Sequence, residues 1–320
     1  MKKNLYHLRY VIVILMLGAA LGIATPAFLS FANLTNVMWS VSVIGIIAVG
    51  ATFAMLVGKI DLSVGRISAM AGIVATIAIQ NWGLHIVPAI AVGIACAALL
   101  GLVNGIIVAT TKIPDFIATF AMSSIILGFA QVITRGTTLS IMEPRAFTFL
   151  GTGKLAGVPM PVIVFVLATA VGVFLLDKTV FGRKCYCVGG NPMAARLSGI
   201  RVRGIVVLAY VLTGAMAGVG GIVHTALSQQ AGPHMGGGYE LDVIAAIVIG
   251  GASMAGGAGT IPGTFFGTIL TGLINNGLNL LNIPGTYHPI VKGVIIIGAV
   301  AFNGFSANLE QKRAKRVATA

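Results

Sequence analysis

The chain has 320 residues, of which 57% are hydrophobic and only 8% are charged. Soluble domains carry about 45–50% apolar and about 25% charged residues, and a disordered chain needs low hydrophobicity and high charge. The composition therefore excludes an ordinary soluble enzyme and a disordered chain. Because one membrane span takes about 20 apolar residues, ten spans would use about 200 residues, and most of the chain is predicted to lie in a membrane.

Apolar runs bounded by glycine, proline, asparagine or charged residues predict ten membrane helices. They fall at roughly 11–29, 38–57, 63–80, 86–109, 115–134, 159–176, 204–224, 240–256, 260–281 and 286–305. Several runs are interrupted by glycine and are candidates for broken helices, which leaves eight or nine full crossings as an alternative. We therefore expect an all-α polytopic membrane protein in which residues 1–320 form one transmembrane domain.

The basic residues are distributed unevenly about these segments. In the ten-span arrangement, 15 of the 20 lysines and arginines lie in the two tails and in the loops on the same side, whereas Arg135, Arg145 and Lys154 lie on the other side. Cytoplasmic loops carry the excess of basic residues, so both termini are predicted to be cytoplasmic. A cleaved signal peptide at the start would change this parity, although the first apolar run is longer than the usual 7–15 residues.

The sequence offers few residues for catalysis or metal binding. Its five histidines are scattered, with no two spaced i, i+4, and Cys96, Cys185 and Cys187 lack metal-ligand spacing. Residues 251–255 lack the last glycine of G-x-S-x-G, and residues 151–154 lack the remainder of a phosphate-binding loop. Aromatic residues make up only 7%, which gives no stacking platform for nucleic acid. We expect no catalytic residue, no metal site, no cofactor bound by this chain and no nucleic-acid partner.

Glycine is frequent, at 43 residues, and small residues one helical turn apart allow helix backbones to approach closely in lipid. Four G-x-x-x-G pairs occur, at Gly18/Gly22, Gly101/Gly105, Gly214/Gly218 and Gly263/Gly267. They predict a compact helical bundle.

Five polar residues recur along the ninth predicted span. They are Thr264, Thr268, Thr271, Asn275 and Asn279, and their intervals of 4, 3, 4 and 4 place them on one face of a helix. Such a polar stripe must face protein or water. It either lines a pathway in which hydroxyls and amides exchange hydrogen bonds with a neutral polyhydroxy solute, or it bonds neighbouring helices at about 0.6 kcal/mol each.

Acidic residues precede two of the apolar runs. Asp61 and Ser63 can cap the amides of the run that follows them, and the acidic charge suits the positive end of a helix. If that helix instead begins at membrane depth, Asp61 is a pathway residue. Glu240 and Asp242 invite the same two interpretations at an outer helix start, where capping or contact with an external partner is favoured over proton relay.

The predicted cytoplasmic loop at 177–203 contains signals for a short helix outside the membrane. Asn191 is a good N-cap, Pro192 suits the first helical position, and Gly199 can end the helix in the left-handed conformation. A membrane domain that is driven by a soluble motor protein needs a rigid helix between two spans to transmit the movement of that motor. The alternative is an ordinary connecting turn.

These motifs together resemble the membrane permeases of bacterial ABC importers for monosaccharides, of the ribose-transport type. The resemblance is carried by GKIDLSVG at 58–65, by Gly-Asn-Pro at 190–192 with Leu-Ser-Gly-Ile at 197–200, and by the glycine-rich run at 238–263 that continues through 275–279. It extends over nearly the whole chain from about residue 35 to residue 300.

The resemblance implies a multi-pass protein of the bacterial inner membrane, surrounded by lipid. It implies a homodimer or a pair of related permeases, two cytoplasmic ATPase domains that use ATP and Mg²⁺, and a periplasmic or lipid-anchored sugar-binding protein. It also implies that residues 189–202 form the coupling helix that docks on the ATPase. The candidate coupling residues are Gly190, Asn191, Pro192, Met193, Arg196, Leu197 and Gly199.

The candidate residues of the substrate pathway combine the acidic motif and the polar stripe. They are Asp61, Ser63, Thr264, Thr268, Thr271, Asn275 and Asn279. The main alternative function is a gradient-driven secondary transporter of a small polar solute, which would need a titratable carboxylate deep in a span.

Overall fold

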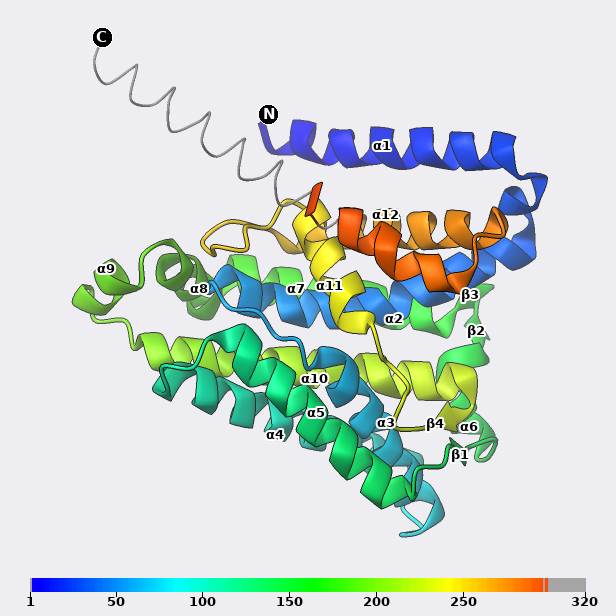
Figure 1. The fold of residues 1–320 in the computed structure, drawn as a ribbon, viewed down its shortest axis with the longest axis horizontal. Helices are drawn as coiled ribbons and strands as arrows, with labels where there is room; N and C mark the ends of the chain where they lie inside the picture. Colours follow the sequence, from blue (N-terminus) through cyan, green and yellow to red (C-terminus); the bar gives the residue numbers. More distant parts are fainter. Residues whose placement is uncertain (1, 296, 299–320) are drawn as a thin grey trace.

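A computed structural model describes residues 2–295 and 297–298 and is mainly helical, as the sequence predicts (Figure 1). The longer helices are α1 (Lys2–Ala24), α2 (Phe31–Leu56), α3 (Val64–Gln80), α4 (Ile86–Thr110), α5 (Asp115–Thr134), α7 (Met160–Val173), α10 (Val202–Ser228) and α12 (Ile261–Leu280). The shorter ones are η1 (Pro26–Leu29), α6 (Arg145–Thr152), the π-helical η2 (Phe174–Lys178), α8 (Val180–Gly190), α9 (Pro192–Leu197), α11 (Tyr239–Ile249) and η3 (Gly285–Tyr287). Two antiparallel ribbons pair β1 (Leu139–Ser140) with β4 (Gln230–Ala231) and β2 (Lys154–Leu155) with β3 (Val158–Pro159).

Five of the described helices are long and apolar enough to cross a membrane. They are α2, α4, α5, α7 together with η2, and α10. The apolar part of α1, at Tyr10–Ala24, and the 17-residue α3 are shorter. The tenth predicted span, at 286–305, lies only partly within the described residues, of which 288–295 are helical. The chain is a multi-pass membrane protein.

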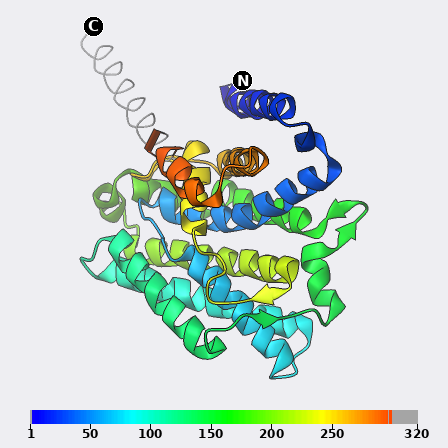
Figure 2. The ribbon, with the colours of Figure 1, turned by 45° about the vertical axis from the view of Figure 1, so that its right-hand side comes forward.

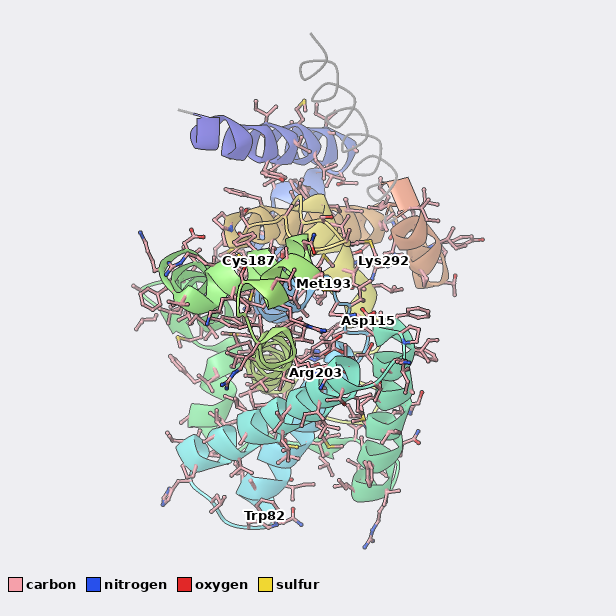
Figure 3. All side chains as sticks on the ribbon, turned by 90° about the vertical axis from the view of Figure 1, so that its left-hand side faces the viewer. Trp82, Asp115, Cys187, Met193, Arg203 and Lys292 are labelled. Atoms are coloured by element: carbon pink, nitrogen blue, oxygen red, sulfur yellow. The ribbon has the colours of Figure 1, made fainter. Side chains whose placement is uncertain are left out.

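Helix α10 occupies the centre of the bundle, and Figure 3 shows it end-on with the other helices around it. It packs against α2, α3 and α4, while α2 also contacts α7, α11 and α12. Every residue of α2 from Val41 to Leu56 is buried, which explains why this span is apolar on all faces. Helix α1 lies outside, over α12 (Figures 1 and 2).

Two helices, α3 and α11, begin inside the bundle. After α2 the chain runs irregularly through residues 57–63, and α3 starts near the middle of α10 (Figure 1). After β4 the chain likewise turns back into the bundle before α11 begins. The start of α3 lies against the turn that leads into α11. A Cβ atom on Gly65 would collide with the backbone oxygen of Gly236, and Arg66 Nη1 donates to the Pro233 oxygen at 3.0 Å.

The predicted span at 240–256 is accordingly too long. Helix α11 ends at Ile249, and the chain continues through a glycine-rich loop to Thr260. Gly251, Gly256 and Gly257 have φ values of 85°, 88° and 73° in this loop. Such values suit glycine and end a helix. Helix α11 is therefore only half the length of a span, as the alternative of glycine-interrupted, broken helices allowed.

The G-x-x-x-G pairs produce backbone contact at two interfaces. A Cβ atom on Gly101 of α4 would lie 3.1 Å from the Cα atom of Gly214 in α10. On α12, Cβ atoms at Gly263 and Gly267 would collide with backbone oxygens of α11 and the residue that follows it. The fourth pair, in α1, approaches only side chains of the following turn.

We expect Gly214→Leu to prevent stable assembly, because its side chain would meet the backbone of α4, which cannot move aside. The matched control is Gly128→Leu on α5, where an added Cβ meets no atom within 4 Å. Overpacking costs about 1–3 kcal/mol or more. Membrane abundance and thermal unfolding in detergent measure the difference, and equal behaviour of the two variants would contradict the close packing.

Candidate functional site

A cavity of about 270 Å³ lies between α2, α10 and α11. Its lining is unusually polar and aromatic for a membrane bundle: Asn36, Trp39, Ser40, Val43, Ile44, His224, Leu227, Tyr239 and Asp242. A smaller cavity of about 10 Å³ shares Ser40, Ile44 and Asp242 with it and reaches Thr268, Thr271 and Asn275 of α12. The smaller space holds about one water molecule, so of these two adjoining cavities only the larger has room for a solute.

Asp242 lies where the two cavities meet, and it is paired. Lys292 Nζ lies 2.8 Å from its Oδ1 atom and 2.9 Å from Oδ2, and Asn275 Nδ2 donates to Oδ1 at 3.3 Å. Asp242 as a whole residue is 6% exposed. Sequence reasoning placed Asp242 at an outer helix start, as a cap or an external contact; the structure instead buries it in an ion pair inside the bundle.

The polar stripe of α12 divides along its length. Thr264 is buried, with its hydroxyl 2.8 Å from that of Thr52 in α2. Thr268 and Thr271 donate to carbonyls of their own helix, at 2.8 and 2.9 Å, and line the small cavity together with Asn275. Asn279 is exposed at the helix end. The structure thus brings three of the five residues to the small cavity and places Thr264 in a contact between helices.

Asp61 and Ser63 belong to a separate polar cluster, in the irregular segment before α3. Asp61 Oδ1 accepts from the Ser63 backbone N–H at 2.8 Å and from its hydroxyl at 2.6 Å. Ser63 in turn accepts from Asn104 Nδ2 at 2.7 Å. Asp61 bonds the turn ahead of α3, while α3 itself has no side-chain cap at Ser63. Neither residue lines the two cavities described above.

The helix predicted within the cytoplasmic loop is present as α9. Asn191 Oδ1 accepts from the backbone N–H groups of Met193 and Ala194, both at 3.0 Å, Pro192 is the first residue, and Gly199 has φ +80°. An additional helix, α8, precedes it and is capped by Thr179. Helix α8 was not predicted from the sequence, although Thr179 before an apolar residue was a usable signal.

A glycine junction holds α8 and α9 against the bundle. We use this name for the contacts of Gly189 and Gly190 at the end of α8 with Gly256 and Gly257, where a Cβ atom added at Gly189 or at Gly257 would collide with backbone atoms. Gly257 N–H also donates to the Leu56 oxygen of α2 at 2.9 Å, and Tyr186 of α8 donates to the Gly259 oxygen at 2.7 Å. The start of α9 is therefore fixed to the end of α2 and to the loop that leads into α12.

The outer face of α9 remains free of this packing. Met193 is 64% exposed and Leu197 is 83% exposed, whereas Ala195 is buried. Figure 3 shows Met193 on the end of the molecule that carries α8 and α9, with Cys187 and Arg203. Two large apolar side chains are thus presented at one end of the bundle.

Sequence reasoning missed the aromatic members of the large cavity. The indole N–H of Trp39 is buried and has no hydrogen-bond partner within the described part of the chain. Tyr239 Oη lies 3.1 Å from His224 Nε2, which joins α11 to α10. A usable signal was the spacing of Asn36, Trp39 and Ser40, which places three polar atoms on one face of an otherwise apolar helix.

We expect Lys292→Met to lower the amount of folded protein, since Asp242 would stay buried without its partner. Removing one member of a buried pair costs at most about 3–5 kcal/mol. The double variant Asp242→Asn with Lys292→Met leaves a neutral site and should recover most of the abundance and thermal stability. A double variant as unstable as Lys292→Met alone would show that the two residues are not energetically coupled.

Comparison with known proteins places the chain in a family. Residues 33–300 match the family described as branched-chain amino acid transport system / permease component. No solved structure matches the chain significantly.

The curated relatives match over almost their full lengths. The chain is 40% identical over 302 residues to the ribose import permease protein of Escherichia coli (strain K12), covering 93% of this chain and 94% of that one. It is 39% identical over 279 residues to the ribose import permease protein of Bacillus subtilis (strain 168), covering 87% and 86%. The L-arabinose ABC transporter permease protein of Azospirillum brasilense is 37% identical over 307 residues, covering 96% and 89%. The chain belongs to this permease family, as a membrane subunit of the ABC transporter kind.

Proposed function

We propose that this protein is the permease subunit of an ATP-driven importer for a monosaccharide such as ribose or a related sugar. The observation that carries the proposal is the similarity to ribose and L-arabinose permeases along nearly the whole chain. In this role the chain catalyses no covalent step. ATP and Mg²⁺ are used by a separate ATPase, and the chain itself binds no cofactor.

The proposed topology has ten membrane segments, in the bacterial inner membrane, with both termini in the cytoplasm. The distribution of basic residues supports it. The end of the bundle with α8 and α9 then faces the cytoplasm, and the ribbons β1–β4 and β2–β3 lie at the opposite end, on the outside (Figure 1). The external end would meet the sugar-binding protein, and a second copy or a related permease would complete the membrane unit.

The exposed face of α9 is proposed as the contact with the ATPase. Met193 and Leu197 offer apolar side chains to a groove, and Arg196 adds a positive charge on the same short helix. Because α9 has only six residues, it cannot stay helical alone in water. The glycine junction supplies the support, so a displacement of α9 is passed to α2 and α12 rather than absorbed by the loop.

A gradient-driven transporter is the less favoured alternative. It needs a titratable carboxylate inside the bundle, and Asp242 is in that place. However, Lys292 already neutralises Asp242 at 2.8 Å. The relatives include a ribose import permease protein and an L-arabinose ABC transporter permease protein. These observations favour ATP-driven import.

Replacing Met193 and Leu197 with Asp and Arg196 with Glu should weaken co-purification of the ATPase and abolish ribose uptake, while membrane insertion stays normal. The reason is that the changes lie outside the packed bundle. The matched control is read by ATPase co-purification alone: Met142, which follows β1, and Leu155 in β2 are exposed, and their replacement with Asp should leave this co-purification unchanged. If the triple variant still binds its ATPase and transports at the original rate, α9 is not the coupling element and the gradient-driven alternative gains support.

The native cysteines test the orientation. Cys187 is exposed on α8, whereas Cys185 is buried and burial raises the pKa of its thiol to about 12. Only the thiolate reacts with maleimides, and a pKa near 12 leaves about one thiolate in ten thousand at pH 8. A membrane-impermeant maleimide should therefore label Cys187 in inside-out vesicles and not in intact cells.

Two further observations complete this cysteine test. Cys187→Ser should remove the labelling at pH 8, and labelling of Cys185 should increase only as the pH rises toward its pKa. Labelling of Cys187 in intact cells would place α8 outside and overturn the proposed topology.

A further inference from the structure

The large cavity has the size and chemistry of a small-molecule site. Its volume of about 270 Å³ far exceeds the 10–15 Å³ needed for one water, and it approaches the lower end, about 300 Å³, of typical ligand pockets. Asn36 and Ser40 are exposed, so the cavity opens at the surface of this chain. A solute can therefore enter it without unfolding of a helix.

The lining suits a neutral polyhydroxy compound. Trp39 and Tyr239 offer aromatic surface, which matches the C–H face of a sugar ring, and each also carries a polar group at its edge. Ser40 and Asn36 supply groups that both donate and accept. Aromatic surface combined with groups of both kinds is what alternating hydroxyls on a carbon ring require.

The charges in the cavity argue against a zwitterion such as an amino acid. A free amino acid needs one cationic and one anionic partner. Asp242 is the carboxylate of the lining, and Lys292 engages both of its oxygens. An added zwitterion would have to break this pair inside the bundle, whereas a neutral sugar can accept hydrogen bonds beside it.

The cavity lining includes a buried donor that a solute could satisfy. The Trp39 indole N–H is buried and unpartnered within the described residues, and Asn275 Oδ1 in the adjoining small cavity is in the same state. Buried polar groups are nearly always hydrogen-bonded. A hydroxyl oxygen of a bound solute would accept from Trp39.

We propose that the cavity between Trp39, His224, Tyr239 and Asp242 is a monosaccharide-binding subsite within the permease. Trp39 donates its indole N–H to a sugar hydroxyl, Tyr239 presents its ring and its hydroxyl, and the neutralised Asp242 disfavours charged solutes. The inference rests on the proposed function, because it assumes that the transported solute is a sugar. It adds the residues that hold the solute. None of these residues belongs to the pathway set predicted from the sequence, but Asn275, Thr268 and Thr271 of that set line the adjoining small cavity.

The protein contains only two tryptophans, which makes the subsite directly measurable. Trp82 is 59% exposed in the loop before α4, and Figure 3 shows it well apart from Lys292. In a Trp82→Phe variant of the full chain, all indole emission comes from Trp39. Titration of this variant in lipid vesicles, which add no tryptophan, with D-ribose should change the emission saturably, and L-leucine should not.

Two matched pairs of variants test the residues. Added to the Trp82→Phe background, Tyr239→Phe should weaken the ribose response about twofold to tenfold, the usual effect of one lost hydrogen bond. Tyr287→Phe, at an exposed tyrosine, should not change it. In cells with the complete transporter, Trp39→Phe should lower the maximal rate of ribose uptake, while Trp82→Phe should leave it unchanged.

The outcomes separate the subsite from the proposed function. ATPase-dependent ribose uptake that is equal in Trp39→Phe and Trp82→Phe, with Trp39 emission unaffected by D-ribose, would overturn the subsite and leave the permease role in place. A response to L-leucine alone would also overturn it, since the cavity would then accept a zwitterion. Absence of both ribose and L-arabinose uptake by the unaltered transporter would overturn the proposed function and the subsite with it.

Discussion

The structure depends on hydrogen bonding of the irregular backbone between α2 and α3. Inside a membrane bundle, N–H and C=O groups that leave a helix must find partners in the protein. The Ile60 N–H donates to Asp115 Oδ2 at 2.6 Å, and the Leu62 N–H donates to the Thr119 hydroxyl at 3.1 Å. Tyr210 donates to the Ile60 oxygen at 2.9 Å. Side chains of α5 and α10 thus make it possible for α3 to begin near the middle of the bundle.

A helix that begins there creates space that a continuous helix would fill. The starts of α3 and α11 meet near Gly65 and Gly236, and the large cavity lies beside the first turn of α11, at Tyr239 and Asp242. The cavity is therefore a consequence of the broken helices. It is also why polar residues occur in spans that lipid would otherwise require to be apolar throughout.

Local features of this molecule were predictable and distant pairings were not. The cap at Asn191 and the stop at Gly199 act within one helical turn, so α9 could be predicted from a few residues. The period of the polar stripe predicted which face of α12 carries the five residues, but not which helices lie against that face. The contacts of Thr264 with α2 and of Asn275 with Asp242 depend on those neighbouring helices. The Asp242–Lys292 pair and the cavity aromatics join separate elements, and no local spacing indicates them. The half-length of α11 depends on glycines in the left-handed conformation after its end. A glycine in the sequence allows this conformation but does not show that the chain adopts it.

The kind of contact at the glycine junction explains how one end of the bundle can affect the other. Long side chains absorb small displacements by changing rotamer, whereas backbone atoms in direct contact cannot. Helix α9 continues from α8, whose last residues touch the backbone of the loop before α12, and that loop is bonded to the end of α2. Helix α2 is buried along Val41–Leu56 and carries Trp39 and Ser40 immediately before that stretch, at the cavity. In the proposed coupling role, a push on α9 would be passed to α2 and α12 through backbone contacts, and both of these helices line the smaller cavity beside Asp242.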